Sequence, residues 1–129
     1  MFETRRAALF AIAVLIGIAF AVGEPFVFAS ALDRPVGPFE TDVLVMNAAL
    51  VSIPFFVLAA RRSGRLLPWL ITFAVTAALH WWWLAKGIAY QRAPDGSGVD
   101  MLGAFIMLVS PLPLTALAMA LDLRIKPVR

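Results

Sequence analysis

The sequence predicts an all-α integral membrane protein, a four-helix bundle with its N- and C-termini on the cytoplasmic side. Of its 129 residues, 62% are hydrophobic and 15% are charged, whereas a soluble domain is about 45–50% apolar and about 25% charged. The mean hydropathy is +0.89. Because a soluble domain this small could not bury so much apolar surface, the composition indicates a chain that is embedded in lipid.

Four apolar segments are each long enough to cross a bilayer, which takes about 20 helical residues. They run from about 7 to 32, 43 to 60, 66 to 89 and 101 to 123, and they make the whole chain, 1–129, a single domain. Asp42 and Asp100 precede apolar runs, as helix N-caps do, and Pro68 falls in the first turn of the third segment. The short link Arg61–Arg65 predicts an antiparallel hairpin of the second and third segments.

The N-terminus has a second interpretation, as a cleavable signal peptide. It combines Arg5 and Arg6 with an apolar stretch and the small residues Ala29-Ser30-Ala31. The apolar stretch is longer than the usual 7–15 residues or so, so we expect the first span to be retained. Cleavage would leave three spans and would place the new N-terminus outside.

The distribution of lysine and arginine predicts the orientation. Short loops follow the positive-inside rule, so the more basic side is expected to be cytoplasmic, and a bacterial-type inner (plasma) membrane is favoured. Aromatic belts at both interfaces agree: we expect Trp69 to anchor the inner end and Trp81, Trp82 and Trp83 to anchor the outer end. The basic residues are Arg5, Arg6, Arg61, Arg62, Arg65, Arg124, Lys126 and Arg129 on one side, against Arg34, Lys86 and Arg92 on the other.

Polar residues within a membrane span are functional candidates because they are costly there. Glu24, Asn47 and His80 come from three different segments. At a rise of about 1.5 Å per residue, all three lie on the order of 5–10 Å below the outer interface. The pattern predicts that the three side chains meet at one level of the bundle.

Helical spacing indicates which faces carry two of these side chains. Glu24 shares a face with small residues that let a neighbouring helix approach closely. His80 shares a face with Pro68 and two threonines. The residues spaced in this way are Ala13, Gly17 and Ala21 before Glu24, and Pro68, Thr72 and Thr76 before His80.

The functional hypothesis is a Glu24–His80 pair, oriented by Asn47, that exchanges a proton or holds a cationic or polar ligand. In a second interpretation the three side chains hydrogen-bond only to hold the helices together. In a third, Glu24 pairs with Lys86 at the outer interface, where a solvated ion pair contributes little.

Four prolines are candidate helix kinks: Pro25, Pro54, Pro111 and Pro113. Pro25 lies near an outer end, where it can simply close its helix. Pro111 and Pro113 lie near the bilayer centre, where freed carbonyls need partners or must line a cavity. They predict either a broken helix that hinges or binds a ligand, or a static kink satisfied by Ser110 and Thr115.

Several classes of function have no support in the sequence. There is no cysteine, and we expect no metal, no cofactor, no catalytic residues and no nucleic-acid partner. We favour a protein that binds or transports a small polar or ionic solute in the lipid bilayer, as a homo-oligomer or within a larger membrane complex. The alternative is a non-catalytic accessory or scaffold subunit of such a complex.

Overall fold

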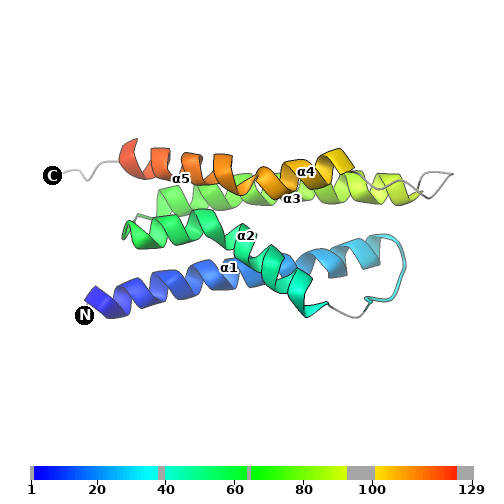
Figure 1. Ribbon diagram of the computed structural model, residues 1–129, viewed down its shortest axis with the longest axis horizontal. Helices are drawn as coiled ribbons and strands as arrows, with labels where there is room; N and C mark the ends of the chain where they lie inside the picture. Colours follow the sequence, from blue (N-terminus) through cyan, green and yellow to red (C-terminus); the bar gives the residue numbers. More distant parts are fainter. Residues whose placement is uncertain (1, 38–39, 64, 93–100, 125–129) are drawn as a thin grey trace.

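The computed structural model describes residues 2–37, 40–63, 65–92 and 101–124, and nearly all of these residues are helical. The beginning of α1, the α2–α3 turn and the end of α5 lie at one end of the bundle, which we call the terminal end (Figure 1). The opposite end is the far end. In chain order the helices are α1 (Phe2–Ala31), α2 (Thr41–Ala60), α3 (Leu66–Arg92), α4 (Met101–Val109) and α5 (Pro111–Arg124).

Among the described residues, four helical stretches are long and apolar enough to cross a membrane, and the last of them comprises α4 and α5. This finding confirms the number and the approximate positions of the predicted long apolar helices. α1 begins earlier and α3 ends later than their apolar runs. The reason is that a helix continues through polar residues of good helix propensity, such as Arg5, Arg6 and Gln91.

The predicted caps are only partly right. Pro68 lies in the first turn of α3, as expected. However, the N-cap of α2 is Glu40, which makes no side-chain capping bond, and Asp42 lies within the first turn. There its negative charge still interacts favourably with the helix dipole. The other predicted cap and several predicted loop and tail residues lie outside the described residues: Asp100, the turn at 94–96, Lys126 and Arg129.

Small residues bring α1 and α2 into close contact. Ala13, Gly17 and Ala21 are all buried, which confirms the predicted packing face of the first span. Ser52 Oγ of α2 lies 2.7 Å from the carbonyl oxygen of Ala48 and 3.1 Å from that of Ala13. Its hydroxyl can therefore bridge the two helices at a level where no side chain separates them.

The hydrophobic core lies towards the terminal end. Phe55 and Leu58 of α2 are fully buried there with Ala118 of α5. Trp69 of α3 packs its ring 5.9 Å from that of Phe55, and its Nε1 donates to the carbonyl of Ser63 at 3.0 Å. Trp69 thus lies near the expected end but is buried, so little of the ring is left to contact lipid headgroups.

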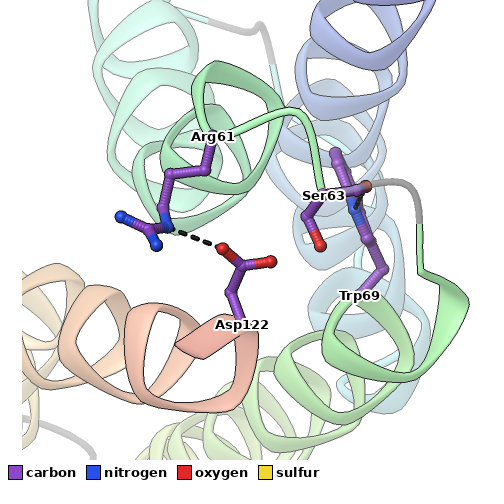
Figure 2. A network of polar contacts seen from close by, with 4 residues as sticks. All are labelled: Arg61, Ser63, Trp69 and Asp122. Atoms are coloured by element: carbon purple, nitrogen blue, oxygen red, sulfur yellow. Dashed lines mark hydrogen bonds and ion pairs between the residues drawn. The ribbon is translucent and has the colours of Figure 1, made fainter. Parts of the chain in front are cut away.

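Two polar contacts join the elements at the terminal end (Figure 2). One is the Trp69–Ser63 bond, which ties the start of α3 to the α2–α3 turn. The other is an ion pair across the bundle, in which Arg61 Nε donates to Asp122 of α5 at 2.6 Å. Sequence reasoning did not single out Asp122, because its partner lies 61 positions away in the chain.

Candidate functional site

Glu24 of α1 and His80 of α3 contact each other in the far half of the bundle. Glu24 Oε1 and His80 Nδ1 are in direct hydrogen-bonding contact, and their side chains are only 14% and 10% exposed. The His80 ring lies 4.9 Å from the Phe20 ring, which in turn lies 5.6 Å from that of Phe73. The Phe20 ring therefore packs against His80, and the exposed Phe73 ring packs against Phe20.

The face predicted for α3 is buried as expected: Pro68, Thr72, Thr76 and His80 are all buried. Thr76 Oγ1 donates to the carbonyl of Thr72 at 2.8 Å, a bond back to its own helix. Thr72 Oγ1 is buried and has no hydrogen-bond partner among the described residues.

Asn47 reaches the same level from α2, although it does not orient the pair. A cavity of about 200 Å³ lies between the helices, and its wall includes Glu24, His80 and Asn47. Within the described part of the chain, Asn47 makes no hydrogen bond to either partner. The structure therefore brings the three predicted residues to one cavity but joins only two of them directly.

The fourth helical stretch is broken beside this cavity. α4 ends at Val109 and α5 begins at Pro111, with Ser110 between them. Pro111 has no N–H to donate to the carbonyl of Met107, its helical partner four residues earlier. Ser110 Oγ donates to that carbonyl instead, at 2.7 Å. Ser110 thus satisfies the carbonyl freed by the proline, as the static-kink interpretation predicted.

The remaining kink candidates behave differently from one another. Thr115 does not stabilise the break, because its Oγ1 is buried without a hydrogen-bond partner among the described residues. α1 continues past Pro25 to Ala31, so Pro25 does not close the helix. Pro54 lies inside α2 and is fully buried. Ser110 and Pro111 both line the cavity, so the broken helix contributes directly to its wall.

A second and larger space continues from the pair towards the far end. It measures about 390 Å³ and shares Glu24, Asn47 and Trp83 with the first cavity. Its wall extends to Tyr90 and Gln91, near the end of α3. Towards the terminal end lies the hydrophobic core. The open space beside the pair therefore extends towards the far end of the bundle.

The three consecutive tryptophans point in different directions. Trp81 is 68% exposed, and Trp82 is also exposed, with Lys86 Nζ 4.7 Å from its ring centroid. Trp83 instead lines both cavities. Sequence reasoning grouped Trp83 with the interface anchors, but its spacing of three from His80 is a helical signal that could have placed it on the same face.

No family model, curated protein or solved structure gives a significant match to this chain. Among the described residues, no three histidine or acidic side chains lie close enough to hold a metal ion.

Proposed function

We propose that this protein is a multi-pass membrane protein that binds a small polar or cationic solute at the Glu24–His80 pair and moves it across the bilayer. Support for the membrane location comes from four long apolar helices whose outward side chains include many large hydrophobic residues. Such a surface suits contact with lipid hydrocarbon.

The observation that carries the proposal is the open space beside the Glu24–His80 pair. A polar pair that serves only to join two helices can be enclosed by packed side chains. Here Glu24 and His80 border a cavity whose other walls include Asn47 and Ser110. A solute in that cavity can replace His80 as the partner of the Glu24 carboxylate and can form hydrogen bonds with neutral polar groups.

The chemistry of the walls favours a cation over an anion. Glu24 is the acidic residue on the two cavity walls, and Trp83, Phe28 and Tyr90 line the larger cavity. A positive charge within about 6 Å of such a ring is attracted to its face. A carboxylate with aromatic rings around it is therefore suited to a small cation that is partly removed from water.

Movement of the solute would require the closed terminal half to open. The break at Ser110 between α4 and α5 borders the site, and a helix broken in this way can move as two halves. Binding that displaces His80 from Glu24 would change the contacts of α3 beside that break. This coupling is the step from binding to transport in our proposal.

The proposed orientation follows the arginine and lysine distribution, with both termini and the α2–α3 turn in the cytoplasm. The cavity at the far end would then receive solute from outside the cell or from the periplasm. A bacterial-type inner membrane fits this arrangement, in which the basic terminal end faces the anionic cytoplasmic leaflet.

Binding of tetramethylammonium tests the proposal, followed in detergent by the change in tryptophan fluorescence that Trp83→Phe abolishes, since the chain has four tryptophans. The neutral near-isostere tert-butanol and the anion acetate are the comparison ligands. We expect only the cation to change the fluorescence, and Glu24→Gln to weaken its binding about tenfold or more, as loss of a charged partner does. Asp42→Asn, which removes the same charge from an exposed position on α2, should leave binding unchanged.

Uptake of labelled tetramethylammonium into proteoliposomes tests the transport step. Equal uptake by wild type and Glu24→Gln would contradict transport through the Glu24 site. The accessory-subunit alternative makes the opposite predictions: no cation response, no uptake, and co-purification with a larger membrane complex in mild detergent. Mass analysis of the same preparation tests the expectation from the sequence that the protein is a homo-oligomer or part of a larger membrane complex.

A further inference from the structure

A groove between α1 and α3 at the terminal end is unrelated to the cavity at Glu24. It measures about 450 Å³, and one wall is formed by Arg5, Leu9, Ile12 and Ile16 of α1. These residues follow one another at helical spacing, so they form a single stripe along the helix. From Arg5 to Ile16 the stripe is about 16 Å long at a rise of about 1.5 Å per residue.

The opposite wall belongs to α3 and the turn before it. Leu66, Leu70 and Phe73 supply apolar surface, and all three are exposed. At the other end of the groove, the Phe73 ring packs 5.6 Å from that of Phe20 of α1. The groove is thus apolar along its length, with arginines Arg5 and Arg65 at its terminal end.

Two hydrogen-bond donors beside the arginine end lack partners among the described residues. Ser63 is only 5% exposed, and its Oγ makes no hydrogen bond to any described residue. Arg65 Nη1 is likewise buried without a partner. Leaving buried donors unpaired is costly, so a ligand with strong acceptor oxygens would be favoured here.

The charges around the groove favour an anion. Within the described part of the chain, neither Arg5 nor Arg65 forms an ion pair with a carboxylate. The nearby acid Asp122 is paired with Arg61, and Glu3 lies two positions before Arg5 on α1. The amino end of α3, a long helix, begins beside the same position and adds its partial positive charge.

We propose that this groove binds one anionic phospholipid, with its phosphate at Arg5, Ser63 and Arg65 and an acyl chain along the apolar walls. A phosphate oxygen accepts bonds from arginine and hydroxyl groups, and arginine suits it geometrically. The apolar walls require hydrocarbon, which inorganic phosphate lacks. This inference depends on the membrane location of the bundle and is independent of the solute site.

Native mass spectrometry of the detergent-purified protein tests the inference. Phosphatidylglycerol and phosphatidylcholine with identical acyl chains are titrated in parallel. We expect tighter binding of phosphatidylglycerol, and a loss of about fivefold for each arginine removed in Arg5→Gln/Arg65→Gln. The matched control, Arg62→Gln/Arg124→Gln, removes the same charge from the same end outside the groove and should bind nearly as wild type does.

Two further arms separate the components of the site. Leu70→Trp fills the apolar part and leaves the charge unchanged, so it should weaken the binding of phosphatidylglycerol as well. Inorganic phosphate in large excess should not displace the lipid. Equal binding of the two lipids, equal losses in the two arginine pairs, or displacement by phosphate would each overturn the proposal. Glu24→Gln should leave lipid binding intact, whatever its effect on cation binding.

Discussion

Gly17 of α1 lies directly against Ser52 of α2. A Cβ atom added at Gly17 would overlap Ser52 Oγ and the carbonyl oxygen of Ala48. Both neighbours are fixed, because Ser52 Oγ lies at hydrogen-bond distance from Ala48 and Ala13 carbonyls. The absence of a side chain at this position therefore sets the distance between α1 and α2. Glu24 lies on the same helix, α1, as Gly17.

The first prediction compares two glycines of the same helix. Gly17→Ala should destabilise the bundle by about 1–3 kcal/mol, as overpacking of a close contact does. Gly23→Ala should be neutral or slightly stabilising, since nothing lies within 4 Å of a Cβ there and alanine favours helix. Unfolding in mixed micelles with increasing dodecyl sulfate, followed by circular dichroism, measures both variants. Equal stability of the two variants would contradict the close contact.

A double-mutant cycle tests the direct interaction of Glu24 and His80. Because the two side chains are in contact and mostly buried, Glu24→Gln and His80→Asn should show a coupling of about 0.5–3 kcal/mol in the free energy of unfolding. The control cycle joins His80→Asn with Asp122→Asn at the opposite end, where the losses should add. Additive losses in the first cycle would mean that the pair contributes nothing to stability.

The helix break supports a prediction of rescue. Ser110→Ala should cost about 1–3 kcal/mol, because the Met107 carbonyl loses its donor in an apolar surrounding. Pro111→Ala restores the backbone N–H that an unbroken helix donates to the same carbonyl. The double variant should therefore be more stable than Ser110→Ala alone, as measured by dodecyl sulfate unfolding. If Pro111→Ala gives no rescue, the Ser110 hydroxyl is not a substitute for that N–H.

The ion pair of Arg61 and Asp122 should be weak in comparison. The Arg61 side chain is 35% exposed, and pairs that reach solvent contribute about 0–1 kcal/mol. Asp122→Asn should therefore lower stability by no more than about 1 kcal/mol, and the difference from wild type should shrink as salt is added. Unfolding at low and high ionic strength measures the effect. A larger loss that is insensitive to salt would indicate that Asp122 has another role.

Single cysteines test the proposed orientation, since the chain has no cysteine of its own. Gly37 is exposed in the link between α1 and α2 at the far end, and nothing lies within 4 Å of a Cβ there. In intact cells, a membrane-impermeant maleimide should label Gly37→Cys but not Arg62→Cys in the α2–α3 turn. Arg62→Cys should be labelled only after the membrane is made permeable. The reverse pattern would show that the protein has the opposite orientation in the membrane.

The sequence alone was sufficient for the features that depend on local structure. Apolar runs predicted the four long helices, since a helix satisfies its backbone hydrogen bonds within itself whatever surrounds it. Helical spacing correctly predicted that Ala13, Gly17 and Ala21 share a buried face, and that Thr72, Thr76 and His80 share another. These relations are set within one helix, so they do not depend on how the helices pack.

Only the tertiary structure decided which side chains meet across helices. Residue order gives the depth of Glu24, Asn47 and His80. The rotation of each helix about its own axis determines that His80 forms a hydrogen bond with Glu24, whereas Asn47 lines the same cavity without a hydrogen bond to either described residue. The same rotation turns Trp83 into the cavity. The distance between helices, which depends on packing at positions such as Gly17, determines where open space remains. Both quantities depend on all the contacts together, and no single segment of the sequence encodes them.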